Sequence, residues 1–559
     1  MTTPETSTSV TRAVALEVGW ATGRSSRRSR RLLAAAVLVG LAWSLWAAGL
    51  GRRPLVNGSG WPQALELVSA IGSPELAPAF LRVVAEAALV TVGYAVLGTA
   101  LALLLGVTGG FVVSQTFWRS RTRGRARVGW GLTRIALALP RGLHEAVWAL
   151  LLVNLLGLDP LVAVLAIGLP YGAITAKVYA DLLDETPRAP YEALLAAGAS
   201  RSQALLLGLL PLIGNDLLSY ACYRLECSVR SAVVLGIVGA GGLGFQLDLS
   251  FAALRYDEMW TVIAALVVLC AAAEAAGSAL RRRLGRSRPR SRGDHAGRLR
   301  PARDPAVLMA VAICLGGTVW SWVYLQVQPE TLWSARTATQ ARLVATQAWP
   351  PAVDTGSLAT LGRSAVETFQ MSLLAAVLAA GAGLAVATVA ARAPSAGVGR
   401  RSAGLLARLL LLLCRAVPPP VWALLVLFVL YPGLLPGAVA LATYNAGVLG
   451  RLMADAQDSL PPGPAVLVRS SGAGRGGTWL YGVLPRVLGK DLAYGLYRWE
   501  VATRETVVVG LVGAGGLGQL LAFQTAGFDW PAVTATLLAL IALTLVVDVL
   551  SALARRACR

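Results

Sequence analysis

One 22-residue stretch occurs twice in this chain, 274 residues apart. The first copy starts at Tyr223 and reads YRLECSVRSAVVLGIVGAGGLG, and the second starts at Tyr497 and reads YRWEVATRETVVVGLVGAGGLG, with 14 of the 22 positions identical. Each copy places two arginines and a glutamate inside an apolar segment and ends in a glycine-rich turn. Charged residues are destabilising inside a membrane and are kept there for pairing or for function. The repeat therefore predicts a membrane protein built from two pseudo-equivalent halves.

The composition also indicates a membrane protein. Charged residues make up 14% of the chain and hydrophobic residues 56%, whereas soluble domains carry about 25% charged residues. The net charge of +21 comes almost wholly from arginine, and these arginines lie between apolar runs. Basic residues in that position follow the positive-inside rule and need no other partner. We therefore expect a lipid bilayer around the chain and no nucleic-acid partner.

The apolar runs divide into six predicted spans in each half, most of them long enough to cross a bilayer. We expect an all-α integral membrane protein of about twelve transmembrane helices, arranged as two halves of six. Because six is an even number, the two copies share one orientation and form a parallel repeat. The predicted spans are 32–50, 84–113, 132–157, 159–180, 207–238 and 259–280 in the first half and 305–327, 365–391, 404–431, 434–454, 481–512 and 530–554 in the second.

Basic residues set the predicted topology. The N-terminus, the loop 114–131 and the C-terminus are rich in arginine, whereas the loops on the other side hold few. The positive-inside rule then places both termini in the cytoplasm. The first apolar run is long for a signal peptide and lacks a good cleavage site, so we predict an uncleaved first span. The expected division is a cytoplasmic tail 1–31, a first unit 32–280, a cytoplasmic linker 281–304 and a second unit 305–559.

Several chemistries have no motif in this sequence. The six cysteines and two histidines show no metal-ligand spacing. The sequence contains no GxxxxGK(S/T) phosphate-binding loop, no nucleophile elbow and no HExxH motif. We therefore expect no catalytic residue, no metal, no cofactor and no ATP hydrolysis by the chain itself.

The connector between the fourth and fifth predicted spans carries a series of helix signals. It reads YEALLAAGASRSQALLLGLLP from Tyr191 to Pro211. Gly198 predicts a break after a short helix, because glycine adopts the left-handed backbone that ends helices. Ser200 and Gln203 have the spacing of a capping box that starts the next helix. Pro211 predicts a kink where that helix enters the membrane.

This connector resembles the cytoplasmic coupling loop of binding-protein-dependent ABC importer permeases. The family pattern is Glu-Ala-Ala, three residues, glycine, nine residues, isoleucine, one residue and Leu-Pro. The chain departs from it at Leu194 and Gly208, and in the second half Val466 replaces the glutamate. The matching positions are Glu192, Ala193, Gly198, Leu210 and Pro211 in the first half and Gly472, Leu484 and Pro485 in the second.

In that family the loop docks into a groove on the ATPase subunit and transmits nucleotide-driven closure. The resemblance implies the same role here, with a weaker helix start in the second copy because of Gly474, Gly476 and Gly477. The residues expected to couple the chain to its ATPase are Glu192, Ala193, Gly198, Arg201, Pro211, Gly472, Arg475 and Pro485.

The duplicated stretch itself looks most like the phosphonate importer permeases, here as a fusion of two permease units. The resemblance implies a type I importer permease fold in a bacterial inner membrane, two separate ATPase subunits and one extracytoplasmic binding protein. It also implies import of phosphonate, phosphite or phosphate. Three alternatives stay open: an ABC importer for another substrate such as thiamine, ferric ion or an amino acid, an ion-driven secondary transporter, and a structural membrane scaffold.

Two charged triplets repeat within the duplicated stretch. Either they line or gate a pathway for an anion, or they form a structural ion-pair lattice between the halves, and the sequence favours neither. The spacing of Glu226 and Arg230 allows them to pair on one helix face. Counted from Pro211, the first triplet is expected past the bilayer midplane, toward the outer side. The candidate pathway residues are Arg224, Glu226, Arg230, Arg498, Glu500 and Arg504, with Arg141 and Arg415 of the third spans as weaker candidates.

The glycines that end each copy match the GxGxxG fingerprint of dinucleotide-binding proteins. That fingerprint needs a strand before it and a helix after it, whereas these glycines follow a predicted membrane helix. We therefore expect a tight re-entrant turn that lets backbones pack closely. Its glycines are Gly239, Gly241, Gly242 and Gly244 in the first copy and Gly513, Gly515, Gly516 and Gly518 in the second.

Overall fold

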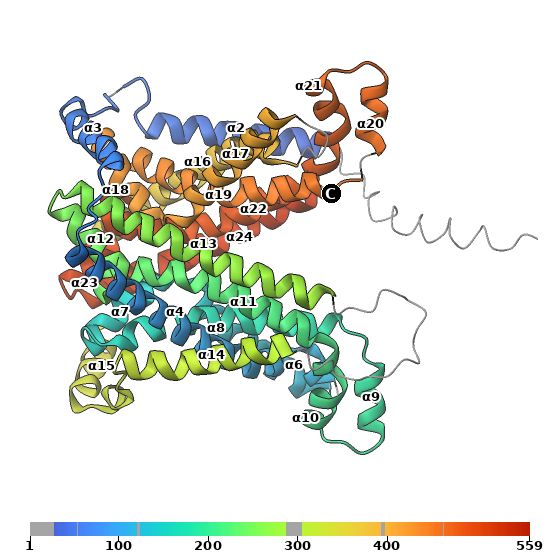
Figure 1. Cartoon of the computed structure of the whole chain (residues 1–559). Coiled ribbons are helices and arrows are strands. Elements are labelled where there is room, and N and C mark those ends of the chain that lie inside the picture. The colour runs from blue at the N-terminus through green and yellow to red at the C-terminus, as the bar shows by residue number, and fades with distance from the viewer. Residues whose placement is uncertain are drawn as a thin grey trace, which may run out of the picture.

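The structure is a computed structural model that describes residues 27–52, 54–119, 123–286, 305–392, 397–461 and 463–558. Most of the predicted N-terminal tail and of the predicted linker lies outside the described residues. The described part is a bundle of helices (Figure 1), and its β-structure is one isolated antiparallel bridge between Val56 and Leu430. The expected all-α class is confirmed.

Each half contributes long helices that run along the bundle and short helices at its ends (Figure 1). In the first half these are α2 (Arg27–Ala47), α3 (Trp61–Ser69), α4 (Pro78–Val113), α5 (Gln115–Arg119), α6 (Arg123–Gly142), α7 (Glu145–Leu156), α8 (Pro160–Glu185), α9 (Ala189–Ala196), α10 (Arg201–Ala204), α11 (Leu210–Leu235), α12 (Gly242–Ala252) and α13 (Tyr256–Arg286). In the second half they are α14 (Pro305–Tyr324), α15 (Ala335–Gln347), α16 (Thr355–Ala390), α17 (Val398–Ala416), α18 (Pro419–Val429), α19 (Leu434–Asp458), α20 (Gly463–Ser470), α21 (Arg475–Thr478), α22 (Leu484–Val509), α23 (Gly516–Ala526) and α24 (Trp530–Cys558).

The described helices account for the predicted spans. Six of them are long and apolar enough to cross a membrane, and three bent helix pairs bring the number to nine. Ala35–Ala47 of α2 and Leu308–Tyr324 of α14 are shorter apolar helices at the positions of the two predicted first spans. With α19 added, each of the twelve predicted spans has a helix or a helix pair in the described part of the chain.

The third predicted span of each half is a broken helix. α6 and α7 meet at an angle of 87°, and α17 and α18 at 97°. Pro140 lies in the last turn of α6, and Pro418 and Pro419 open α18. Proline lacks an N–H donor and blocks the preceding turn, so a straight helix cannot continue through these positions. Arg141 and Arg415 lie directly before the two corners.

The first helix of each half packs against the other half. α2 contacts α16 and α24, and a Cβ atom at Gly40 would lie 2.8 Å from the Leu373 side chain. α14 contacts α4, and a Cβ atom at Gly93 would lie 2.9 Å from Leu325, which follows α14. In Figure 1 the blue α2 lies beside orange helices of the second half, and the yellow α14 lies along the first half. The two halves therefore interlock.

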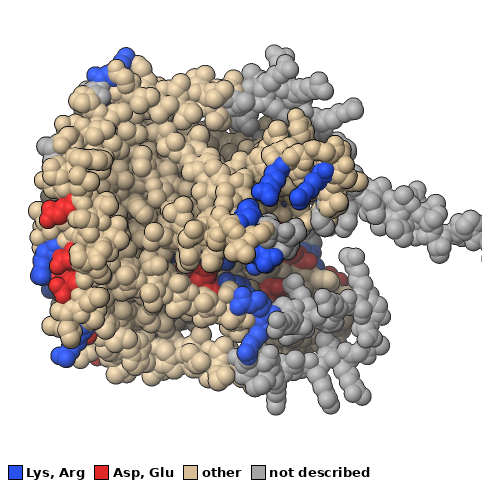
Figure 2. Space-filling view, turned by 45° about the horizontal axis from the view of Figure 1, so that its top comes forward, with Lys and Arg blue, Asp and Glu red and all other residues tan. Residues whose placement is uncertain are grey.

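The surface of the bundle is apolar along its flank. Figure 2 shows charged side chains mostly near the two ends of the molecule, with few on the flank between them. Large apolar side chains are exposed there, such as Leu315 of α14 and Leu406 of α17, which are 64% and 65% exposed. An apolar band between charged ends is the surface that a bilayer requires. The chain is a multi-pass membrane protein.

Candidate functional site

The first predicted coupling element is a short helix that ends in a glycine turn. Helix α9 is followed by Gly198 at φ 89°. The amide of Gly198 donates to the Leu195 carbonyl, and the amide of Ala199 donates to the Leu194 carbonyl, both at 3.0 Å. These two bonds make a Schellman motif, which places its left-handed residue where Gly198 stands. The turn itself therefore requires the glycine.

The next helix starts with the predicted capping box. The Gln203 amide donates to Ser200 Oγ at 3.3 Å, and the Ser200 amide donates to Gln203 Oε1 at 2.9 Å. α10 then passes into a π-helical segment, η4 (Leu205–Leu209), directly before Pro211 in the first turn of α11. Proline cannot donate the hydrogen bond of a regular α-helix, and a π-helical turn accommodates that loss. The capping box is confirmed, and the irregular segment lies directly before Pro211.

One aromatic side chain anchors α9 to the bundle. Tyr191 is 3% exposed and packs with Leu183, Leu209 and Ile213. Burial raises the pKa of its phenol. The next residue, Glu192, is exposed. The helix thus has one side fixed to the bundle and one side open to solvent.

The second predicted coupling element also has a left-handed glycine after its short helix. The helix that follows starts without a side-chain cap, and apolar residues replace the exposed glutamate of the first copy. α20 ends before Gly472, whose φ is 88°. α21 has Gly474 at its N-cap, without a side-chain hydrogen bond. Val466, which replaces the glutamate of the first copy, is 59% exposed, and the following Leu467 is 71% exposed. Both elements project from the same end of the bundle (Figure 1), so they face the same side of the membrane.

Two glycines at matched positions of the repeat, Gly208 and Gly482, let helices pack closely, a role that the sequence motifs did not predict. A Cβ atom at Gly208 would lie 3.3 Å from the backbone of Pro190 and 3.1 Å from the Leu194 side chain. A Cβ atom at Gly482, 274 residues on, would lie 3.0 Å from the Ala465 Cα. The helix that enters the membrane therefore packs directly on α9 in the first half and on α20 in the second, where an isoleucine would not fit. The recurrence of glycine at the repeat offset was a signal of this packing.

The two glutamates of the triplets pair with arginines of their own half. Glu226 Oε1 lies 2.6 Å from Arg281 Nη1, and Glu500 Oε1 lies 2.6 Å from Arg555 Nη1. Glu226 thus reaches across to α13. It does not pair with Arg230, although the helical spacing of these two residues would allow that pair. The first bond joins α11 to α13 and the second joins α22 to α24, so each bond braces its own half.

The expected depth of the triplets has to be corrected. Arg281 lies in the last turns of α13, toward the end of the bundle that carries the coupling elements (Figure 1), so Glu226 lies near that end as well. The stretch Arg201–Ala240 is helical over 40 residues, whereas a bilayer core takes about 20. The first turns after Pro211 therefore lie outside the membrane core, and counting from Pro211 placed the triplet too far toward the outer side.

Arg224 is held by aromatic side chains. It is 8% exposed, and its Nε donates to the Tyr220 hydroxyl at 3.0 Å. Its guanidinium carbon lies 4.7 Å from the ring centroid of Tyr171 and 5.5 Å from that of Tyr223. Cation–π contacts of this kind stabilise a desolvated guanidinium. Arg224 forms no ion pair with a carboxylate of the described residues, and the aromatic contacts hold its guanidinium group instead.

Its counterpart in the second half, Arg498, is held by a carboxylate. Arg498 Nη2 donates to Glu505 Oε1 at 3.0 Å and its Nε to Asn445 Oδ1 at 2.6 Å, while Asn445 Nδ2 donates to Glu505 Oε2 at 3.0 Å. Position 505 corresponds to Ser231, which donates to Glu145 Oε1 at 2.6 Å. Each half thus buries a carboxylate in this region, supplied from a different helix. Neither Glu145 nor Glu505 was predicted as a site residue. The difference between Ser231 and Glu505 at matched positions of the repeat was the sequence feature that pointed to Glu505.

Arg230 and Arg504 face the interface between the halves. Arg504 Nη1 donates to the Arg141 carbonyl of the other half at 3.2 Å. Arg230 makes no hydrogen bond or ion pair with the residues that the structure describes. Arg415, in the third span of the second half, pairs with Glu274 of the first half at 2.5 Å. The charged residues of the third and fifth spans therefore meet between the halves.

The glycine-rich ends of the duplicated stretch are left-handed turns. Gly239, Gly241 and Gly242 have φ values of 104°, 92° and 77°. A Cβ atom at Gly242 would lie 2.6 Å from Thr91 Oγ1, which accepts a hydrogen bond from the Leu243 amide at 2.9 Å. The turn therefore brings the first residues of α12 directly against α4. The second copy has the same left-handed pattern at its glycines.

We expect replacement of Thr91 by valine to lower the free energy of unfolding by about 1–3 kcal/mol, because the Leu243 amide would stay buried without an acceptor. Thr368 makes the same bond to the Leu517 amide at 2.9 Å, so Thr368→Val should give a similar loss. Thr108→Val is the control, since Thr108 is exposed on the same helix as Thr91 and bonds that helix alone. Thermal unfolding in detergent measures the three differences, and equal midpoints for Thr91→Val and Thr108→Val would contradict the expectation.

Two segments of the chain match one protein family, described as the binding-protein-dependent transport system inner membrane component. The phosphate-import permease protein PhnE of Mycolicibacterium smegmatis is 29% identical over 490 residues, which are 87% of this chain and 87% of that protein. The phosphite transport system permease protein PtxC of Stutzerimonas stutzeri is 30% identical over 34% of this chain and 68% of its own length. PhnE2 of Escherichia coli, named as a cryptic phosphonate transport system permease protein, is 38% identical over 20% of this chain and 93% of its own length.

The matched segments are residues 123–286 and 383–559, one in each half. Each contains a predicted coupling element, a charged triplet and a glycine turn, so the family match and the internal repeat divide the chain in the same way. The chain belongs to the family of binding-protein-dependent transport system inner membrane components, as a fusion of two permease units.

Proposed function

We propose that the chain is the transmembrane permease of an ABC importer that moves a phosphorus oxyanion, such as phosphate, phosphite or a phosphonate, into the cytoplasm. The observation that carries the proposal is the alignment over 87% of the chain with a relative named as a phosphate-import permease. Relatives named for phosphite and phosphonate transport align with parts of it. These anions share a tetrahedral phosphorus with charged oxygens, so the proposal names their class.

The coupling elements support separate ATPase subunits as the source of energy. Both elements project from one end of the bundle (Figure 1), so an ATPase dimer below it would receive one element in each copy. The exposed Glu192 and Val466 occupy the same position in the two elements, and we propose that they make different contacts with two like grooves. The proposed coupling residues are Glu192, Ala193, Gly198, Arg201, Pro211, Gly472, Arg475 and Pro485.

The opposite end of the bundle supports docking of one extracytoplasmic binding protein. α3 and α15 lie at that end (Figure 1). Large aromatic side chains are exposed in or beside these helices: Trp61 is 53%, Trp333 77% and Trp349 72% exposed. Exposed tryptophans are typical of the centres of protein interfaces. We propose that the binding protein delivers the anion there, and that both chain termini lie on the cytoplasmic side of a bacterial inner membrane.

The residues of the charged triplets divide among three proposed roles. Glu226 and Glu500 each close an ion pair within their own half, which supports a bracing role. Arg230 and Arg504 lie at the interface of the halves, which supports a role on the pathway. Arg224, which is buried among aromatic side chains, would supply positive potential without direct contact, whereas Arg498 is paired with Glu505.

Reconstitution tests the proposed function. The chain, its ATPase subunits and its binding protein are placed in liposomes, and uptake of phosphate, phosphite and methylphosphonate is measured with and without ATP. We expect uptake of at least one of these anions that requires ATP, the ATPase and the binding protein together. Uptake driven by an ion gradient without the ATPase would favour a secondary transporter. ATP-dependent uptake of thiamine, ferric ion or an amino acid, with none of the three phosphorus anions, would overturn the substrate class.

A further inference from the structure

Arginines of the third and fifth spans meet in pairs across the interface, and the 274-residue repeat relates two such pairs. Arg504 of α22 lies beside Arg141 of α6, with a 3.2 Å bond from Arg504 Nη1 to the Arg141 carbonyl. The equivalent pair is Arg230 of α11 and Arg415 of α17, whose charges interact. In each pair, one guanidinium comes from the first half and the other from the second. Like charges brought together in this way call for an anion.

In the pair formed by Arg230 and Arg415, one member, Arg415, already has an anion within the protein. Glu274 of α13 accepts from Arg415 Nη2 at 2.5 Å through Oε2. Its other oxygen pairs with Arg451 of α19. A bridging carboxylate that accepts from two guanidinium groups satisfies both of its oxygens. Arg415 is therefore already paired in the described conformation, whereas Arg230 makes no hydrogen bond or ion pair with a described residue.

The pair formed by Arg141 and Arg504 has no such anion. The residue equivalent to Glu274 is Asp548 of α24, which is one methylene shorter, and its buried Oδ1 has no hydrogen-bond partner. The Arg141 side chain makes no hydrogen bond or ion pair with a described residue, and the buried Arg504 Nε is also unpaired. The residue equivalent to Arg451 is Lys177, an exposed side chain. This pair therefore lacks the carboxylate that accepts from Arg415 in its counterpart.

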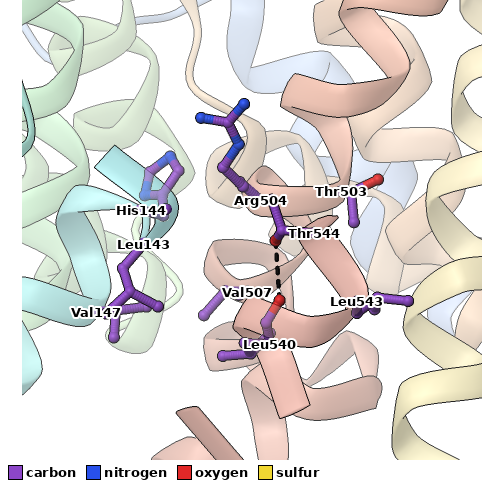
Figure 3. A pocket seen from close by; sticks show the side chains of 10 residues that line it. Leu143, His144, Val147, Thr503, Arg504, Val507, Leu540, Leu543 and Thr544 are labelled. Atoms are coloured by element: carbon purple, nitrogen blue, oxygen red, sulfur yellow. Dashed lines mark hydrogen bonds between the residues drawn. The ribbon is translucent and has the colours of Figure 1, made fainter. Parts of the chain in front are cut away.

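A small pocket lies beside the open pair, between the two halves. Gly142, Leu143 and His144 line it from the corner between α6 and α7, and Thr503, Arg504 and Thr544 line it from α22 and α24. Figure 3 shows the Arg504 side chain extending from its helix into the gap toward His144. The two groups of lining residues belong to different halves, so relative movement of the halves changes the width of this pocket. The free guanidinium donors thus stand at a site that can open.

We propose that Arg141 and Arg504 form a binding station for a tetrahedral phosphorus oxyanion on the path between the halves, while at the equivalent position in the repeat Arg415 is already paired with Glu274. The guanidinium group presents paired N–H donors that match the oxygens of a phosphate or phosphonate. Two such groups from opposite halves offset the charge of a dianion, and moving the halves apart releases it. The inference rests on the proposed function and assigns the two repeats different tasks within it.

The test uses the complete complex in liposomes, with inorganic [32P]phosphate as the probe, and measures uptake per ATP hydrolysed. Arg141→Gln should lower this ratio by about tenfold or more, the effect of losing one charge-assisted hydrogen bond, and Arg141→Lys should restore part of it. Asp548→Glu should give a comparable loss, because the longer carboxylate would reach Arg141 as Glu274 reaches the equivalent Arg415. Arg134→Gln is the control, since Arg134 is exposed on the same helix as Arg141 and stacks on Trp130.

The outcomes separate this inference from the proposed function. Stimulation of the ATPase by the binding protein should stay at the wild-type level in Arg141→Gln and Asp548→Glu, because both coupling elements are intact. Uptake ratios equal to that of Arg134→Gln in both variants would overturn the station while leaving the importer in place. Absence of phosphate, phosphite and methylphosphonate uptake by the wild-type complex would overturn the proposed function itself. If Arg141→Gln does not fold, Asp548→Glu still decides the question.

Discussion

Replacing Gly198 with proline is expected to abolish ATP-driven import while leaving the chain inserted in the membrane. Gly198 has a φ of 89°, and its amide donates to the Leu195 carbonyl at 3.0 Å. Proline fixes φ near −65° and has no amide hydrogen, so it removes the turn that joins α9 to α10 at a cost of about 3 kcal/mol or more. That free energy is a bias of about a hundredfold against the native turn. Because a Cβ atom at Gly198 would meet nothing within 4 Å, the effect arises from the backbone alone.

The measurement is uptake into liposomes together with stimulation of the ATPase by the binding protein, both of which should fall. Gly198→Asn is the matched control, because asparagine tolerates the left-handed backbone and should keep most of the activity. Gly472→Pro makes the same change in the second element, where φ is 88°, and its separate effect shows how far that element contributes. Unchanged uptake in the double variant Gly198→Pro, Gly472→Pro would contradict the coupling assignment.

Removal of the Glu505 carboxylate should produce the largest loss of stability. Glu505 is 7% exposed and pairs at 3.0 Å with Arg498, whose side chain is 11% exposed. Glu505→Ala leaves that guanidinium buried with Asn445 as its partner, and breaking one side of a buried ion pair lowers the free energy of unfolding by about 3–5 kcal/mol. Thermal unfolding and size-exclusion profiles in detergent measure this loss. The exposed Glu185 provides the control, and Glu185→Ala should unfold with the wild type.

The double variant Arg498→Leu, Glu505→Leu distinguishes pairing from simple loss of packing. Because replacing a whole buried ion pair by apolar side chains is often neutral, the double variant should recover most of the stability lost in Glu505→Ala. A midpoint for Glu505→Ala equal to that of Glu185→Ala would show that Arg498 does not depend on its carboxylate. A double variant as unstable as the single one would show that packing around position 505 causes the loss.

The local features of the fold were predictable because their physical causes lie within a few residues. Ser200 and Gln203 form the capping box that their spacing indicates, and Gly198 takes the left-handed conformation that ends α9. The positions of the spans follow from apolar length, since a helix must cross the bilayer core in about 20 residues. The repeat also indicates packing at single positions. Gly208 and Gly482, which are 274 residues apart, each allow two helices to pack closely.

The partners of the charged residues were not predictable, because they are chosen by contacts between distant helices. The spacing of Glu226 allowed a bond to Arg230 on its own helix, whereas the structure gives it Arg281, which lies 55 residues further along the chain. Arg415 reaches Glu274 in the other half. No periodicity in the sequence reports such pairs, since they depend on how helices pack side by side and on which side chains have the length to meet.

The sequence by itself determined a two-fold repeat of membrane helices, with two short connector helices that end at Gly198 and Gly472 on one side and two glycine turns on the other. These follow from composition, apolar length and short motifs, all of which act over one helix or one turn. The tertiary structure alone decided that α2 and α14 pack on the opposite halves, and that Glu274 pairs with Arg415 while the equivalent Arg141 has no carboxylate partner among the described residues. Asp548 is one methylene shorter than Glu274, and the effect of that difference on reach appears only when helices from the two halves are brought together.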